Sequence, residues 1–237
     1  RYRSGNGEES EIGFEPSVDG FYRLTPSLTA TWTWKTDFAE TDVDDRQINT
    51  TRFPLFFPEK RSFFLEDAKN FRFGGIVRSP LPFHSRTIGL ASNGSRVPIE
   101  FGGKLTGKAG KWNLGLLGVQ LEGTEELNPD EVYVGRVSYD VLDESSLGGI
   151  FTLGDPRSNG DAQTYGLDFE LKNSSLGELK EGRLRGWVMG TDGEKDDYGW
   201  GLSAVYPNKP LYARASWQRL GEDLDPAVGF IRQSNEI

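Results

Sequence analysis

Apolar and polar residues alternate with a period of two along most of the chain, which is the pattern of a β-strand with one buried and one exposed face. The clearest case is the stretch 28–35, where apolar residues occupy every second position: Leu28, Ala30, Trp32 and Trp34. We expect a short strand before it, at 20–24, and a possible strand at 11–15. The alternation returns at Ile99 and continues almost to the end of the chain.

The segments that follow Ile99 predict antiparallel hairpins joined alternately by short turns and longer acidic loops. Each strand is about ten residues long, and a last strand is expected to begin near Val228. The predicted fold is therefore all-β, an antiparallel up-and-down meander. The expected strands after the first two are 99–106, 112–121, 133–141, 147–153, 164–171, 183–189, 198–206 and 211–218.

Residues 37–97 interrupt this pattern. The stretch 49–66 within them contains five phenylalanines among charged residues and has neither a strand period nor a helix period, and Pro54 and Pro58 would break a regular ladder. Nearly sixty residues without strand signals are too many for a plain connection in a compact domain. We therefore expect one domain in three parts: first strands in 1–36, an irregular plug-like insertion in 37–97, and a hairpin wall in 98–237.

Strands of about ten residues, joined by connections of unequal length, are typical of transmembrane β-barrels. Such barrels also carry aromatic residues near strand ends. Tyrosine and tryptophan occur at such positions here: Tyr133, Tyr165, Tyr198, Tyr206 and Trp217. A soluble β-sandwich alternates in the same way. A sandwich face rarely sets so many glycines and charges opposite so many aromatic residues, so the pattern favours part of a barrel. In that barrel Lys104, Arg136, Asp168, Glu170 and Arg214 would face the interior, while rings such as Phe169 and Trp200 would face lipid.

Composition narrows the function classes. The 237 residues carry a net charge of −9, which argues against a nucleic-acid surface. Without cysteine, neither disulfides nor thiolate metal sites can form, and His84 is the only histidine. No apolar run is long enough for a membrane helix, and no signal peptide is visible at Arg1. The abrupt start at Arg1 suggests a mature or truncated segment.

The acidic stretch 37–45 contains the candidate oxygen ligands of a calcium site, Asp37, Glu40, Asp42 and Asp44. The spacing fits no EF-hand loop, and the stretch lacks the glycine of that loop. A solvated acidic loop, or carboxylates paired with neighbouring basic residues, is the favoured interpretation. No other cofactor is indicated.

Two glutamates in the phenylalanine-rich stretch, Glu59 and Glu66, are the candidates for a glycoside hydrolase pair. Nothing in the sequence sets their separation. The favoured alternative is a buried ionic network with basic residues of the insertion. These two glutamates and four basic residues of the insertion are also the candidate ligand-binding residues: Arg52, Glu59, Lys60, Arg61, Glu66 and Arg86. The phenylalanines around them could bind an apolar ligand, but a hydrophobic anchor for the insertion is favoured.

Two further motifs are better explained by structure than by catalysis. His84 next to Ser85 is not a catalytic dyad by adjacency alone, and no nucleophile elbow surrounds Ser85. The stretch 102–107 lacks the residue order of a phosphate-binding loop and predicts a strand whose glycines relieve crowding.

Several motifs together resemble the DUF5916 family. They are Asp37-Phe38-Ala39-Glu40, Thr51-Arg52-Phe53, Phe56-Phe57-Pro58-Glu59-Lys60-Arg61, Phe63-Phe64-Leu65-Glu66, Phe83-His84-Ser85-Arg86-Thr87-Ile88-Gly89, Gly103-Lys104-Leu105-Thr106-Gly107-Lys108 and Asp225-Pro226-Ala227-Val228-Gly229-Phe230. The likeness runs from about residue 20 to the end. His84 and Thr87 stand where the family usually has Tyr and Arg, and Ser62 stands where Pro is common.

The DUF5916 family consists of bacterial envelope proteins in which a module similar to family 9 carbohydrate-binding modules precedes an outer-membrane β-barrel. The resemblance implies an outer-membrane location, a lipid bilayer as partner, and strands beyond those of this sequence, from the same chain or a partner chain. Carbohydrate recognition is not carried over, because the likeness does not include that module. We expect transport or surface binding of a polysaccharide or another small molecule, rather than catalysis. The alternatives are a carbohydrate-active hydrolase and a soluble β-sandwich that binds carbohydrate.

Overall fold

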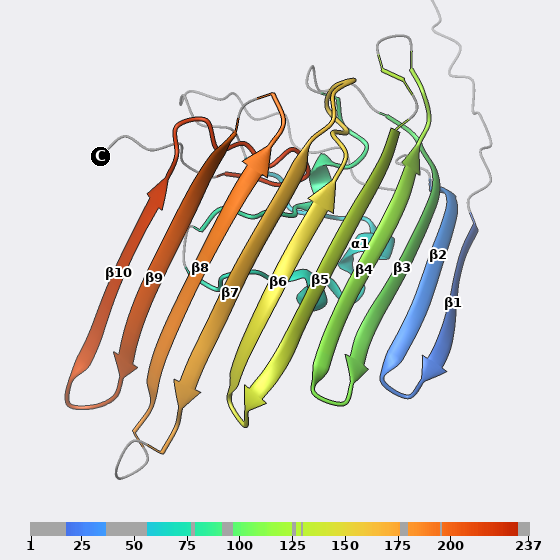
Figure 1. Ribbon diagram of the computed structural model, residues 1–237. Helices are drawn as coiled ribbons and strands as arrows, with labels where there is room; N and C mark the ends of the chain where they lie inside the picture. Colours follow the sequence, from blue (N-terminus) through green and yellow to red (C-terminus); the bar gives the residue numbers. More distant parts are fainter. Residues whose placement is uncertain are drawn as a thin grey trace, which may run out of the picture.

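Ten antiparallel strands form a single sheet in which each strand pairs with its neighbours in the sequence (Figure 1). The computed structural model describes residues 18–36, 56–76, 79–91, 97–124, 127–128, 130–175, 180–194 and 196–231. The predicted all-β meander is confirmed. The strands are β1 (Val18–Thr25), β2 (Leu28–Thr36), β3 (Ile99–Ala109), β4 (Trp112–Leu121), β5 (Asp130–Leu142), β6 (Ser145–Leu153), β7 (Gln163–Asn173), β8 (Gly182–Asp192), β9 (Asp197–Pro207) and β10 (Tyr212–Leu220).

The connections at the two ends of the sheet differ in length. Two-residue turns join β1 to β2, β3 to β4 and β5 to β6 at the lower end in Figure 1, where longer connections also join β7 to β8 and β9 to β10; the connection that contains the insertion lies at the upper end. The turn after β3 contains Gly110, whose φ of 62° suits a residue without a Cβ atom. The predicted alternation of short turns and longer loops is therefore present from β1 to β7, whereas the connection between β7 and β8 is as long as that between β4 and β5.

The part of the insertion that the structure describes, residues 56–76 and 79–91, is called the inserted segment below. It contains no strand and only three short helical turns: α1 (Ser62–Leu65), η1 (Ala68–Phe71) and η2 (Ser85–Thr87). It lies behind the sheet in Figure 1, against one face. The expectation of an irregular but ordered insertion agrees with these residues. In the described parts of the chain, no helix is long and apolar enough to cross a membrane.

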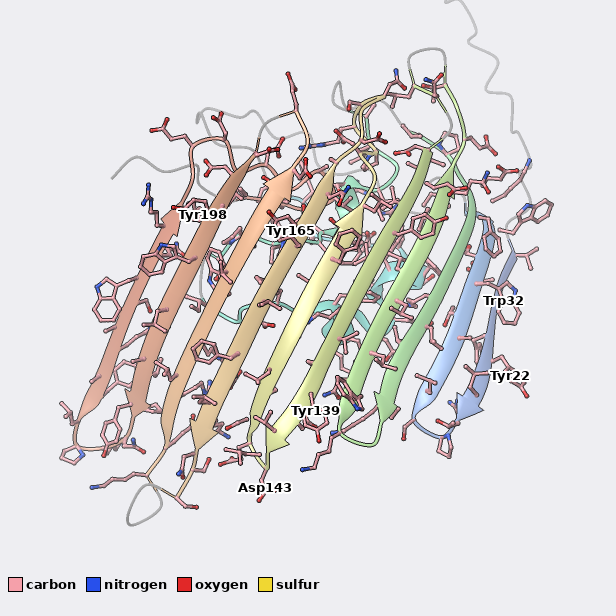
Figure 2. The ribbon with its side chains drawn as sticks, viewed as in Figure 1. Tyr22, Trp32, Tyr139, Asp143, Tyr165 and Tyr198 are labelled. Atoms are coloured by element: carbon pink, nitrogen blue, oxygen red, sulfur yellow. The ribbon has the colours of Figure 1, made fainter. Side chains whose placement is uncertain are left out.

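The two faces of the sheet differ in their environment. The covered face packs against the inserted segment and the residues after β10, and it contains two clusters of buried apolar side chains. The open face carries exposed rings and aliphatic side chains, several of which Figure 2 displays. Since successive residues of a strand point to opposite faces, the predicted alternation decides which residue lies on which face. Trp200 and Phe169 share the open face, as the alternation predicted.

Four expectations need correction or restriction. No strand begins near Val228; the residues 221–231 turn back over the covered face, where Leu224 and Val228 are buried and Phe230 forms one isolated bridge with Leu81. Among the described residues the sheet is open, because β1 pairs only with β2 and β10 only with β9. All ten strands belong to this one sheet, so these residues do not form the two stacked sheets of a sandwich. The possible strand at 11–15 lies outside the described residues.

Candidate functional site

The inserted segment is held on the covered face by glycines that leave room for its phenylalanine rings. A Cβ atom at Gly102 would lie 3.2 Å from the ring of Phe63, one at Gly115 would lie 3.1 Å from Phe71, and one at Gly166 would lie 2.7 Å from Phe73. The three glycines come from β3, β4 and β7, and all three rings are buried. The predicted role of Gly102 in relieving crowding and the predicted anchoring role of the phenylalanines agree with these contacts.

Basic side chains of the sheet bind backbone carbonyls of the inserted segment. Lys104 of β3 donates to the carbonyls of Phe63, at 2.5 Å, and Glu66, at 2.7 Å. Arg136 of β5 donates to the carbonyl of Arg72 at 2.9 Å. Arg185 of β8 reaches Gly75 at 2.8 Å. These carbonyls end short helical turns or lie in irregular backbone, so they have few partners within the segment itself.

An ion pair between Arg136 and Asp168 lies at the centre of the contact between the sheet and the inserted segment. The two side chains are 2.7 Å apart and nearly buried, and Asp168 also accepts a hydrogen bond from the amide of Gly74 at 2.9 Å. Room for the guanidinium comes from Gly148, because a Cβ atom there would overlap it. Lys104, Arg136, Asp168 and Glu170 thus share the covered face, as the alternation predicted. Arg214 shares this face near its lower end.

The candidate ligand-binding residues of the insertion do not converge on one point. Glu59 and Arg61 form a buried ion pair, Lys60 is exposed, and Arg86 is half-buried. The side chain of Glu66 is exposed, and it is the backbone carbonyl of this residue that binds Lys104. Arg52 lies outside the described residues.

The environment of Glu59 is that of a structural carboxylate. Burial favours a higher pKa, but the hydrogen bonds and charge of Arg61 outweigh it and lower the pKa of Glu59 to about 2. Arg61 also donates to the carbonyls of Ile88 and Ser85, at 2.9 and 2.7 Å. A carboxyl group with such a pKa stays ionised at neutral pH and is unsuited to the role of general acid. The ionic network is therefore the better account of Glu59.

His84 lies where the inserted segment meets the residues after β10. Its ring contacts those of Phe56, with centroids 4.8 Å apart, and Phe230, at 5.7 Å. The Nε2 atom lies 3.1 Å from the carbonyl of Phe57, and the backbone amide donates to Val228. Burial lowers the pKa of His84. These contacts agree with the structural role predicted for His84.

The calcium candidates Asp37, Glu40, Asp42 and Asp44 lie outside the described residues. Within the described ranges, no three histidine or carboxylate side chains come close enough together to hold a metal ion. The acidic loops at the upper end instead make ion pairs, such as the two 3.0 Å contacts of Arg157 with Asp225.

The open face is apolar over most of its width. Aromatic rings there lie over glycines of the adjacent strand: Tyr133 over Gly118, Phe169 over Gly186, and Tyr165 over Gly190. Figure 2 shows Tyr165 and Tyr198 towards the upper end of this face and Tyr139 towards the lower end. Between the rings are shallow apolar grooves, of which one bordered by Phe151, Tyr165 and Tyr198 has a volume of about 730 Å³.

Sequence reasoning missed the pairing of particular glycines with particular rings. The available signal was the occurrence of glycine within the strands, as at Gly102, Gly115 and Gly166. That signal shows where a close approach is allowed, but it does not say which ring approaches.

No protein-family model, curated protein or solved structure matches this chain. The resemblance to the DUF5916 family therefore stays a prediction.

Proposed function

We propose that the chain forms part of the wall of an outer-membrane β-barrel, with the inserted segment inside the lumen, and that the protein transports or binds a solute. One observation carries the proposal: the sheet has an exposed apolar face, and its other face, which carries charged side chains among buried apolar ones, is covered by a segment of its own chain. A sheet in a membrane barrel needs this division, because one face meets lipid and the other the lumen.

The open face would be unfavourable in water. Large apolar side chains are exposed along the whole sheet, with Leu167 at 65%, Tyr165 at 55% and Trp200 at 41% of their full accessibility. Monomeric soluble proteins rarely expose a contiguous apolar patch of more than a few hundred Å². Lipid chains would cover this face and fill its grooves.

Dimensions and connections support the same proposal. Most of the strands have nine to eleven residues, as a tilted strand needs to cross a bilayer. Three connections at one end are two-residue turns, as at the periplasmic end of bacterial barrels, and the connection that contains the insertion lies at the other end. The resemblance to DUF5916 proteins points to the same membrane.

The open edges of the sheet require further strands in a barrel. Unpaired backbone groups are strongly unfavourable in lipid, so β1 and β10 would each need a partner strand. A barrel of ten strands is also too narrow for the inserted segment, since a barrel of eight is filled by its own side chains and plugged lumens occur in much wider barrels. The proposed barrel therefore contains more strands than the ten described.

Tryptophan quenching by brominated lipids tests the proposal. Five of the six tryptophans lie on the open face, Trp32, Trp34, Trp112, Trp200 and Trp217, and only Trp187 lies on the covered face. Variants that retain Trp200 alone or Trp187 alone, with phenylalanine at the other five positions, are reconstituted into vesicles. We expect strong quenching of Trp200 and weak quenching of Trp187. Equal quenching, or a chain that stays monodisperse without detergent, would contradict the proposal.

The transport part of the proposal needs its own measurement. The inserted segment fills space over the covered face, so deletion of residues 49–66 should raise the conductance of the protein in planar bilayers. Lys60→Ala, which changes only an exposed side chain of the segment, should leave conductance as it was. An unchanged or absent pore after the deletion would contradict transport through this lumen.

A further inference from the structure

A row of three residues crosses the covered face beside the inserted segment. Trp187 of β8 lies opposite Gly201 of β9, and Gly201 lies opposite Gln218 of β10. Opposite residues of antiparallel strands share a face, so the three side-chain positions are adjacent. A Cβ atom at residue 201 would overlap the indole nitrogen of Trp187, which places this nitrogen directly over Gly201, the residue that pairs with Gln218.

Two polar atoms of this row are buried and have no hydrogen-bond partner among the residues that the structure describes. They are the indole nitrogen of Trp187, a residue only 4% exposed, and the side-chain oxygen of Gln218. One is a donor and the other is an acceptor. A buried polar group left unpaired costs about 1–3 kcal/mol, so two of them in one row indicate a position at which a bound molecule completes the hydrogen bonding.

The chemistry of a ligand follows from the groups around this position. A hydroxyl group can accept from the indole N–H and donate to the amide oxygen at the same time. Further along the same face are the hydroxyls of Ser203 and Ser216, which lie 2.8 Å apart, and then Arg214. Arg214 is exposed and makes no ion pair with the described residues, so its guanidinium is available to an anionic group.

We propose that this row is a binding subsite for an acidic saccharide, in which a hydroxyl bridges Trp187 and Gln218 and a carboxylate binds Arg214. Gln218 and Arg214 are four residues apart on one strand, or about 13 Å at 3.3 Å per residue, and both side chains can reach inward over that span. This spacing suits a uronic acid disaccharide. An acidic saccharide would then be the class of solute in the proposed function. The subsite rests on the proposed function in one respect, namely that the covered face lines a lumen.

The inserted segment is part of this subsite. Phe73 lies 6.3 Å from Trp187, measured between ring centroids, and a Cβ atom at Gly74 would lie 2.9 Å from the indole ring. The segment therefore covers the face of the indole and leaves its N–H edge directed towards β10. A saccharide at this edge would lie beside the segment, between its residues Phe73 and Gly74 and the strand β10.

The test measures binding of digalacturonate to the full chain in detergent by titration calorimetry, with lactose as a neutral disaccharide and acetate as a simple carboxylate. We expect the affinity for digalacturonate to exceed the affinities for lactose and for acetate. Arg214→Leu should weaken it about ten- to a hundredfold, because a charge-assisted hydrogen bond is lost. Trp187→Phe and Gln218→Leu should each weaken it about three- to tenfold. Arg219→Leu, on the open face of the same strand, should bind as the wild type does.

Several outcomes would overturn the subsite. One is no measurable binding of digalacturonate, in which case the row holds water only. Others are equal affinity for lactose or acetate, and an Arg214→Leu variant that binds like Arg219→Leu. Arg214 is exposed, so its replacement tests the subsite even where Trp187→Phe fails to fold. If lipid quenches Trp200 but digalacturonate does not bind, the subsite is contradicted and the barrel is not. If digalacturonate binds a chain that needs no detergent, the barrel is contradicted and the subsite is not.

Discussion

Glycine occurs on both faces of the sheet, but its neighbours differ between them. On the covered face, Gly115 and Gly166 lie beneath rings of the inserted segment, which is distant in the sequence. On the open face, Gly118 and Gly190 lie beneath tyrosines of the next strand, paired with them in the sheet itself. The covered face therefore depends on a separate segment for its packing, whereas the open face makes its own ring-to-glycine contacts and still leaves apolar surface exposed.

This difference in packing predicts how each face responds to substitution. The covered face combines the glycine contacts with hydrogen bonds and an ion pair that fix one position of the inserted segment, so it should be sensitive to small changes. The open face has no fixed partner among the described residues, so it should tolerate changes of shape but not of polarity if lipid covers it. Three matched pairs of substitutions test this contrast, and a fourth prediction concerns His84 of the inserted segment.

The largest effect is expected from Arg136→Met. This change leaves Asp168 buried without its cation and removes the hydrogen bond to Arg72, so the free energy of unfolding should fall by about 3–5 kcal/mol. The control is Lys108→Met, because Lys108 and Asp140 form an exposed ion pair near a turn of the same face. This control should change stability by about 1 kcal/mol or less. Urea titration in detergent measures both, and equal losses would refute the central role of Arg136.

On the open face, Leu167→Arg should destabilise the protein in a bilayer by about 2–4 kcal/mol, because the charge would lie near mid-membrane. Leu142→Arg is the matched control at the turn end of β5, where the expected change is about 0–1 kcal/mol. Both leucines are about equally exposed, at 65% and 64%. Unfolding in lipid vesicles measures the difference. If the two variants are equally stable there, the open face does not meet lipid.

Glycine replacement compares the two faces directly. Gly166→Val on the covered face should cost about 1–3 kcal/mol, because the new side chain would overlap the ring of Phe73. Gly135→Val on the open face has only Leu116 nearby, at 3.8 Å from the new Cβ, and should change stability by about 0.5 kcal/mol or less. Exposure of residues 56–76 to protease provides a second measurement. A Gly166→Val protein with unchanged protection would show that the segment does not need this glycine.

The smallest effect concerns His84, whose pKa is lowered by burial. A lowered pKa in the folded state stabilises the protein fully above the unfolded value of about 6.5, and this stabilisation is lost as pH falls from there through the folded pKa. Stability should therefore decline below about pH 6.5, and less so in His84→Gln. As the only histidine, His84 gives a single pair of imidazole signals for NMR titration. A titration midpoint at or above 6.5 would contradict this expectation.

The alternation predicted the strands well because it reports a local constraint. Residues such as Trp200 and Gly201 are neighbours in the chain but must point to opposite faces, whatever the rest of the fold does. The expectation near Val228 failed because buried apolar residues at close spacing suit a strand and an irregular packed segment equally. There, Pro226 and Gly229 form a turn, with the amide of Gly229 bound to the carbonyl of Pro226 at 2.8 Å.

The candidate residues of the insertion were predicted as a group, but the structure separates them. Glu59 binds Arg61 two residues away, whereas Glu66 contributes only its backbone to Lys104. Their nearness in sequence said nothing about where each side chain points, because the segment has no regular period. The subsite of Trp187 and Gln218 could not be predicted at all, since it depends on the register of three strands.

By itself, the sequence determined that the chain is an all-β meander, which residues share a face, and that an irregular phenylalanine-rich segment interrupts the strands. These properties follow from local periodicity and from proline and glycine positions. Only the tertiary structure decided which ring lies over which glycine, that Arg136 pairs with Asp168, and that the residues after β10 return to the covered face. Such contacts join residues far apart in the chain, and their energies depend on packing geometry that no local pattern contains.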